Sequence, residues 1–385
     1  MSYKEFLNYW KLKKMNFLVL LVLCLVTCST YGQKDQIISL NIGDTAPPLC
    51  IKDWIKGTPI AGFEKGKVYV VEFWATWCVP CKAAIPHLSS LADKYRNKVT
   101  FLGINILEKK TTSVQQIKSF VDSMGHQMDY YVATEESNLM EAGWLNASGA
   151  KRQGIPNTFV INTEGKVAWI GHPKDIAEVL PKIVNDTWDI KEALSKRNSD
   201  RYLRELADSL NIELVIYAEN HFKKDYRGKP ELALQAIDEI VRKEPRLKYT
   251  PSIASFTFRS LLKTNQHKAY EYATVFLVTS TYEEPDYSMI YDIINEYSTS
   301  LRLSAEIYKL GAEAHQIDID KLPYPQLVNL PKRYSKMAEL YWCANDKLKA
   351  IEAQQKALEE LKSKKGISKA EMETFRTQLQ KYKNM

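Results

Sequence analysis

Two cysteines, Cys78 and Cys81, stand two residues apart at the point where a strongly apolar run gives way to a helical pattern. The unpaired N–H groups and partial positive charge of a helix N-terminus favour a thiolate on the first cysteine. Attack of that thiolate on a substrate disulfide would give a mixed disulfide, which the second thiol would resolve. We therefore expect a redox-active disulfide, with Cys78 facing solvent as the nucleophile and Cys81 more buried as the resolving thiol.

A zinc half-site is the alternative interpretation of two cysteines at this spacing. Zinc would need two further ligands nearby, and none of the six histidines is paired in that way. Cys24 and Cys28 lie in the N-terminal apolar run, whereas Cys50 and Cys343 are isolated, which is typical of small buried side chains. The spacing and context favour redox chemistry, and neither a metal nor a cofactor is expected.

Glu72 is the one charged residue in the apolar run Val68–Ala75. An isolated buried carboxyl group has a raised pKa and could relay a proton between Cys81 and water. Alternatively, the alternation of the strand points this side chain to a polar face. The period of a strand alone does not decide between the two.

Ile155-Pro156 precedes a second apolar strand. A cis bond here would make a tight turn whose backbone faces the disulfide, and the Ile155 backbone could then pair with an extended substrate segment. The alternative is an ordinary trans proline at the start of a strand. Trp77, directly before Cys78, is expected to shield one side of the cysteine pair and to contact the substrate.

Strand and helix patterns alternate around these residues, which predicts an α/β sheet. A turn at residues 162–165 predicts a terminal hairpin. The expected strands are Val68–Trp74, Val99–Ile106, Tyr130–Ala133, Thr158–Ile161 and Lys166–Ile170, and the expected helices are Val79–Tyr95, Ser113–Met124, Ser137–Gly143 and Asp175–Val184.

The character of the sequence changes at about residue 186, where strand-like runs end and Glu, Lys, Leu and Ala become frequent. We expect residues 186–385 to form an all-helical domain. Apolar pairs seven residues apart recur at intervals near the period of tetratricopeptide repeats, and other helical hairpins fit the pattern equally well. The pairs are Ala233/Ile240, Ala269/Phe276, Ala305/Ala312 and Ala350/Ala357.

Residues 1–32 have the pattern of an export signal, because lysines precede a short apolar run, Phe17–Val26, that is too short to span a bilayer comfortably. Cys28 lies in a weak lipoprotein-like motif, so a lipid anchor there is a second possibility. The net charge of +7 in 385 residues is small and scattered, which argues against nucleic acid as a partner. These features predict a location in the periplasm or cell envelope, with residues 33–185 as the redox domain.

Several motifs together resemble the TlpA-like thiol–disulfide oxidoreductases, exported bacterial members of the thioredoxin superfamily. They are F-W-A-T-W-C-V-P-C at residues 73–81, Pro86, G-I-P-N-T-F at residues 154–159 and G-H-P at residues 171–173, within a resemblance that covers about residues 41–185. The resemblance implies a thioredoxin fold, Cys78 and Cys81 as the redox pair, Pro156 as a cis proline and Glu72 as the buried acid. Ala84 stands where relatives in cytochrome maturation carry an acidic residue, which argues against that specialised role.

The sequence therefore predicts an exported thiol–disulfide oxidoreductase, acting as a reductase on protein disulfides and served by a membrane or periplasmic thiol partner. One alternative is a thiol peroxidase of the peroxiredoxin-related branch. Such peroxidases place a threonine three residues before the attacking cysteine, and here that position is Ala75. The other alternative is a helical interaction scaffold with an accessory redox domain.

Overall fold

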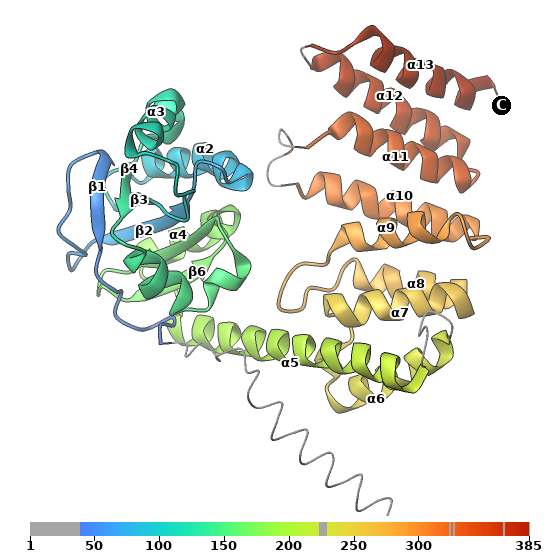
Figure 1. Cartoon of the computed structure of the whole chain (residues 1–385), viewed down its shortest axis with the longest axis horizontal. Coiled ribbons are helices and arrows are strands. Elements are labelled where there is room, and N and C mark those ends of the chain that lie inside the picture. The colour runs from blue at the N-terminus through green and yellow to red at the C-terminus, as the bar shows by residue number, and fades with distance from the viewer. Residues whose placement is uncertain (1–38, 223–228, 323–324, 326–327, 365, 385) are drawn as a thin grey trace, which may run out of the picture.

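The structure is a computed structural model that describes residues 39–222, 229–322, 325, 328–364 and 366–384. The expected leader, residues 1–32 with Cys28, lies outside them. Figure 1 shows an α/β part built on one sheet and a stack of helices, with the long helix α5 (Ile190–Phe222) running below both in this view. The expected fold class, a thioredoxin-like α/β fold followed by an all-helical region, is confirmed.

The strands of the described chain form one mixed sheet in the order β1-β4-β3-β2-β5-β6. The neighbours β2, β3 and β4 are parallel, β5 is antiparallel to β2, and β6 is antiparallel to β5 in the expected hairpin. The edge strand β1 is antiparallel to β4. The strands are β1 Ile51–Lys56, β2 Val68–Trp74, β3 Val99–Asn105, β4 Tyr131–Glu135, β5 Asn157–Ile161 and β6 Val167–Gly171.

Alternation along β2 divides the core of the α/β part into two layers, and every residue of this strand is buried. Val70 and Trp74 face a layer shared with α2 (Val79–Lys94), α3 (Val114–Met124) and α4 (Ile176–Val184). Side chains at the alternate positions, such as Phe73, face a second layer. That layer contains Leu40 and Ile42 before β1, the short helices η2 (Glu141–Asn146) and η3 (Ala150–Gln153), and the first turns of α5. The helix α2 follows β2 after a short turn, so its first residues lie at the carboxyl end of this buried strand.

One expected helix, Ser137–Gly143, has different bounds. Ser137 and Asn138 adopt positive φ angles, so the chain turns there, and a π-helix follows at Glu141–Asn146. The left-handed conformation of two successive residues is incompatible with the start of a right-handed helix, which explains the delay.

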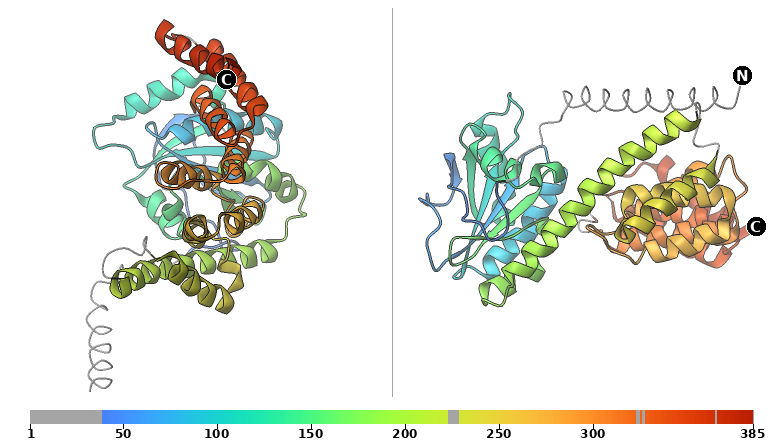
Figure 2. Two further views of the ribbon diagram at one scale, coloured as in Figure 1. Left: turned by 90° about the vertical axis from the view of Figure 1, so that its right-hand side faces the viewer. Right: turned by 90° about the horizontal axis from the view of Figure 1, so that it is seen from below.

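The helical region forms a stack in which each helix from α9 to α13 packs against the next. Two further views of the stack are given in Figure 2. Within the described ranges, no helix is both long and apolar enough to cross a membrane. The helices are α6 Pro230–Lys243, α7 Pro251–Thr264, α8 Gln266–Phe276, α9 Tyr287–Tyr297, α10 Ala305–Asp320, α11 Leu330–Cys343, α12 Lys347–Ser363 and α13 Lys369–Asn384.

Four alanines of the repeat pattern are fully buried between helices, whereas Ala305 is exposed at the start of α10. Small side chains let neighbouring helices approach closely, which explains why the pattern recurs with the helical pairs. The buried alanines are Ala269, Ala312, Ala350 and Ala357. The relation to tetratricopeptide repeats stays a prediction.

The helix α5 packs against both parts of the molecule. Its first turns place Ile190 and Leu194 against the second core layer of the α/β part. Further along, Leu203 and Ala207 join a small cluster with Ile237 of α6. The expected division at residues 185 and 186 thus falls just before a helix that both parts share, and it too stays a prediction.

Candidate active site

One edge of the sheet collects the loops that carry the predicted site residues. The strands β2, β3, β4 and β6 all run in the same direction, so their carboxyl ends lie along this edge. The strand β5 runs in the opposite direction and therefore begins there. Cys78 follows β2, and Pro156 directly precedes β5. The topology thus brings together two motifs that are far apart in the sequence.

Cys78 and Cys81 are joined by a disulfide at the first turn of α2, with an S–S distance of 2.04 Å. Cys78 is the N-cap of this helix, and its sulfur accepts a hydrogen bond from the backbone N–H of Cys81 at 3.2 Å. Such an N–H group at a helix N-terminus also stabilises a thiolate. The pair therefore has the expected position at the start of a helix.

The expectation that Cys78 faces solvent is wrong for this oxidised form. Its exposed fraction is 2%, against 0% for Cys81. The bond to Cys81 holds the sulfur against the first core layer, and the carbonyl oxygen of Ile155 lies 3.6 Å from it. The sulfur of Cys78 is therefore almost fully covered while the disulfide is formed.

The Ile155–Pro156 bond is cis, as the first of the two alternatives required. Ile155 is half-buried and Pro156 is buried at the start of β5. The turn brings the backbone of Ile155, before β5, to the sulfur of Cys78, which follows the neighbouring strand β2. The structure thus places the predicted substrate-contacting residue directly beside the predicted nucleophile.

Trp77 and Val79 flank Cys78 and are unusually exposed for apolar side chains, with exposed fractions of 47% and 53%. The Trp77 ring is held at one end, because its Nε1–H donates to the carbonyl oxygen of Leu107 at 2.8 Å. Leu107 itself adopts a positive φ of 55°. An anchored aromatic ring and a neighbouring valine give the surface around the disulfide an apolar character.

Glu108 holds the turn before the cysteines, and the sequence did not single it out. One carboxylate oxygen accepts a hydrogen bond from the backbone N–H of Thr76 at 2.6 Å, and the other accepts from the Thr76 hydroxyl at 2.9 Å. The side chain of Asn105 donates to the same carboxylate at 2.9 Å. A signal was present, because an acidic residue just after β3 must lie beside the loop that follows its parallel neighbour β2.

Glu72 is buried, with an exposed fraction of 2%, which decides between the two interpretations of this residue. Neither carboxyl oxygen has a hydrogen-bond partner among the described residues, and burial raises the pKa of Glu72 to about 8. The residue lies on the same face of β2 as Trp74, whose layer contains both cysteines. A carboxyl group that titrates near neutral pH is suited to donate and accept protons.

A glycine leaves room beside this acid. Gly103 is the register partner of Glu72 on β3. A Cβ atom at Gly103 would come within 2.9 Å of the Tyr130 ring and 3.2 Å of Trp74 Nε1. The Tyr130 hydroxyl and Trp74 Nε1 are buried and, within the described chain, have no hydrogen-bond partner. Burial, reinforced by Glu72, raises the pKa of Tyr130 well above its usual value, so both neighbours of the acid are neutral.

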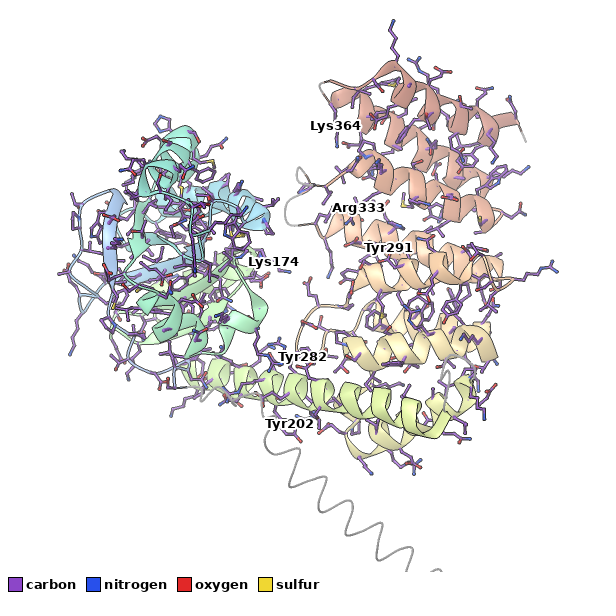
Figure 3. All side chains as sticks on the ribbon, viewed as in Figure 1. Lys174, Tyr202, Tyr282, Tyr291, Arg333 and Lys364 are labelled. Atoms are coloured by element: carbon purple, nitrogen blue, oxygen red, sulfur yellow. A yellow bond between two sulfur atoms is a disulfide. The ribbon has the colours of Figure 1, made fainter. Side chains whose placement is uncertain are left out.

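The end of β6 completes the edge. His172 caps the short helix η4 (Pro173–Asp175), and its Nδ1 accepts a hydrogen bond from the backbone N–H of Lys174 at 3.1 Å. Burial, reinforced by the charge of Lys174, lowers the pKa of His172 to about 4, so the ring is neutral at neutral pH. The helix η4 packs against α2. In Figure 3 Lys174 points from the α/β part toward the helical stack.

The two isolated cysteines differ from the expectation that they are buried. Cys50 is half-buried, and Cys343 is exposed at the end of α11. Cys50 packs against the second core layer of the α/β part, whereas Cys343 stands in the last turn of its helix, where the side chain reaches the surface.

Known proteins resemble the α/β part of the chain. Residues 42–170 match the model of the AhpC/TSA family. The chain is 31% identical over 166 residues to protein FixW of Rhizobium leguminosarum, covering 42% of this chain and 74% of that protein. It is 26% identical over 167 residues to the thiol-disulfide oxidoreductase ResA of Bacillus cereus, covering 40% of this chain and 87% of ResA.

Among solved structures, that of StoA from Bacillus subtilis matches with a TM-score of 0.28 and 20% identity, covering 35% of this chain and 98% of StoA. All three matches cover well under half of the chain. The enzyme class expected from the sequence, a thiol–disulfide oxidoreductase, is confirmed by the family match and by relatives with that name. The chain belongs to the AhpC/TSA family of thioredoxin-like proteins.

Proposed function

We propose that this protein is an exported reductase of protein disulfides that works through Cys78 and Cys81. The observation that carries the proposal is the position of the disulfide at the N-terminus of α2, beside the carbonyl of Ile155 in the cis-proline turn. The helix N-terminus favours the thiolate, and the turn offers backbone to an extended substrate.

The reaction has two exchange steps. In the reduced enzyme the Cys78 thiolate attacks one sulfur of the substrate disulfide, forming a mixed disulfide and expelling the other substrate sulfur as a thiolate, which takes up a proton. Cys81 then loses its proton and attacks Cys78, which restores the internal disulfide and expels the second substrate thiolate. Two electrons pass from the cysteine pair to the substrate, so a thiol partner must reduce the enzyme again.

Glu72 is the proposed acceptor of the Cys81 proton. It lies in the layer below the disulfide, and its pKa of about 8 allows the carboxylate to form near neutral pH. Trp77 and Ile155 are the proposed substrate contacts, the first through its exposed ring and the second through its backbone. Pro156 acts through the shape of the turn.

Export to the periplasm or cell envelope is supported by the sequence of residues 1–32, and lipidation at Cys28 is the alternative form of attachment. We propose the domain division at residues 33–185 and 186–385, with the helical part serving recognition of substrate or partner. Fractionation of cells that produce the full chain tests the location. Metabolic labelling with a radioactive fatty acid, compared with Cys28→Ser, tests the anchor.

The thiol peroxidase alternative has less support from the site. The only threonine close to the expected position is Thr76, and its hydroxyl is engaged by Glu108. Hydrogen peroxide consumption by the reduced protein, compared with reduction of insulin, separates the two activities. Faster turnover with peroxide than with insulin would replace the proposed function by the alternative.

A further inference from the structure

The helical stack is attached to the α/β part by a continuous helix and not by a loose linker. Beyond the apolar contacts of its first turns, α5 makes polar contacts with η3 and the loop before it. The Arg197 guanidinium donates to the carbonyl oxygen of Ser148 at 2.9 Å, and Arg152 forms an ion pair with Asp208 at 2.6 Å. These contacts fix the direction in which α5 leaves the α/β part.

A loop of the stack, residues 277–286 between α8 and α9, returns to the α/β part. Glu284 in this loop forms an ion pair with Lys174 of η4 at 3.5 Å, and Lys321 at the end of α10 lies 3.9 Å from the same carboxylate. The guanidinium of Arg204 on α5 lies over the ring of Tyr282 at 5.0 Å. The 277–286 loop thus contacts α5, its own stack and η4 at the active-site edge of the sheet. Lys174 of η4 and Tyr282 of the loop are labelled in Figure 3.

The ion pair between Lys174 and Glu284 lies close to the disulfide. The strand β6 is two positions from β2 in the sheet, a lateral distance of roughly 10 Å at the usual strand spacing. The short helix η4, which carries Lys174, follows β6 directly and packs against α2, whose first turn holds both cysteines. An extended chain rises about 3.3 Å per residue, so some three to six residues of a bound polypeptide would reach from Cys78 to the contact.

We propose that the 277–286 loop forms one wall of the substrate site, so that the enzyme selects disulfides carried by extended, unfolded polypeptide segments over those on folded proteins. This inference rests on the proposed exchange function and names its substrate class. The loop bounds one end of the active-site edge, and exposed Trp77 and Val79 lie nearer the disulfide. With the loop as a wall on one side and the Trp77 and Val79 side chains beside the cysteines, a thin segment reaches the pair more readily than a folded domain does.

A zero-length cross-link tests the contact itself. A carbodiimide joins an amine and a carboxylate that are already in contact, so treatment of the full chain should yield a cross-linked peptide pair containing Lys174 and Glu284. Glu284→Gln should abolish this product and leave the Lys196–Asp200 cross-link, from a pair at 2.7 Å within α5, as the internal control. Absence of the Lys174–Glu284 product, with the control product present, overturns the proposal.

Competing substrates test the selectivity. The probes are two linear peptides joined by one disulfide, native ribonuclease A as the folded protein, and 5,5′-dithiobis(2-nitrobenzoic acid) as the small disulfide. The measured quantity is the ratio of kcat/KM for the peptide probe to kcat/KM for ribonuclease A. We expect a ratio above one for the unaltered chain and a ratio at least threefold lower for Glu284→Ala combined with Tyr282→Ala, because the loop then loses its ties to η4 and α5.

Two further variants give the test its controls. Glu313→Ala removes an ion pair with Lys309 inside α10 and should leave the ratio unchanged. Lys174→Ala should lower the ratio as Glu284→Ala does, and combining the two should lower it no further if they act through each other. Equal ratios for Glu284→Ala/Tyr282→Ala and Glu313→Ala overturn the inference. Failure of the unaltered reduced enzyme to reduce the small disulfide would instead overturn the proposed function.

Discussion

The carboxylate of Glu108 accepts two hydrogen bonds from Thr76, one from the backbone N–H and one from the hydroxyl. Thr76 stands two residues before Cys78, whereas Glu108 follows the neighbouring strand β3. The turn that presents the nucleophile is therefore fixed from outside its own segment, and the same loop holds the Trp77 ring through Leu107. The redox centre depends on two loops, of which only one contains cysteines.

Removal of this carboxylate should loosen the turn. Glu108→Ala leaves the Thr76 N–H without its acceptor, and loss of hydrogen bonds to a charged group costs about 1.5–3 kcal/mol each. We expect a lower free energy of unfolding in urea and slower reduction of insulin. Thr76→Val removes only the hydroxyl bond and should have the smaller effect on both quantities. Equal stability and activity of Glu108→Ala and the unaltered protein would show that the contact does not position the turn.

Titration of Glu72 should make the stability of the oxidised protein depend on pH. The pKa is raised from 4.5 to about 8 on folding, so between these values the folded state binds a proton that the unfolded state has lost. The contribution of this group is therefore fully present below pH 4.5 and is lost as the pH rises to about 8. We expect the free energy of unfolding to fall across this window by about 5 kcal/mol more in the unaltered protein than in Glu72→Gln. Parallel pH curves for the two proteins would contradict the assignment.

The ionisation of Glu72 should also govern how the rate of substrate release depends on pH. If the Glu72 carboxylate accepts the Cys81 proton, release of substrate from the mixed disulfide should accelerate with pH up to about 8 and then level off. Glu72→Gln should be slower in this step and lose that inflection. Stopped-flow measurement of the change in tryptophan fluorescence during a single turnover provides the rate. An unchanged inflection in Glu72→Gln would assign it to another group.

The two cysteines should have separable roles. Cys81→Ser cannot resolve the mixed disulfide, so it should accumulate a covalent complex with a substrate protein, visible on a non-reducing gel and reversed by dithiothreitol. Cys78→Ser should form no such complex and should not reduce insulin. Accumulation of the complex in Cys78→Ser, and not in Cys81→Ser, would reverse the assignment of nucleophile and resolving thiol.

Gly103 should tolerate no side chain. Its alanine variant would push against the Tyr130 ring at 2.9 Å and Trp74 Nε1 at 3.2 Å, and overpacking of a core costs about 1–3 kcal/mol. A Cβ atom at Gly62 would meet no heavy atom within 4 Å, so this glycine serves as the matched control. We expect urea unfolding to show destabilisation in Gly103→Ala and little change in Gly62→Ala. Equal stability of the two variants would mean that the space beside Glu72 accommodates a methyl group.

Local sequence patterns predicted much of this site. A cysteine pair after a buried strand determines its own backbone surroundings, so the disulfide could be placed in advance. The cis turn at Pro156 was implied by the family resemblance, since the residues alone left cis and trans open. The resemblance implied that Glu72 is the buried acid, whereas the strand period left this open, because the face on which a side chain lies depends on what packs against the sheet. Burial of Cys78 was missed for a related reason, since the turn that covers it comes from Ile155.

Contacts between segments far apart in the sequence were not predictable from pattern. Glu108 meets Thr76 only because β2 and β3 are parallel neighbours. Glu284 meets Lys174 only because α5 carries the helical stack past the active-site edge. Neither Glu108 nor Glu284 belongs to a motif, and each lies in a loop with other charged residues beside it. The contacts of such residues depend on how the strands and helices are arranged. A single sequence with weak helical repeats does not specify this arrangement.

The reduction potential of the Cys78–Cys81 pair tests the central claim most directly. Equilibration of the full chain with dithiothreitol and glutathione redox buffers, followed by alkylation and mass spectrometry, gives the fraction of reduced pair at each buffer potential. A protein disulfide reductase should have a potential near that of thioredoxin, about −270 mV. A potential near that of DsbA, about −120 mV, would contradict the proposed direction and identify the protein as an oxidant of its substrates.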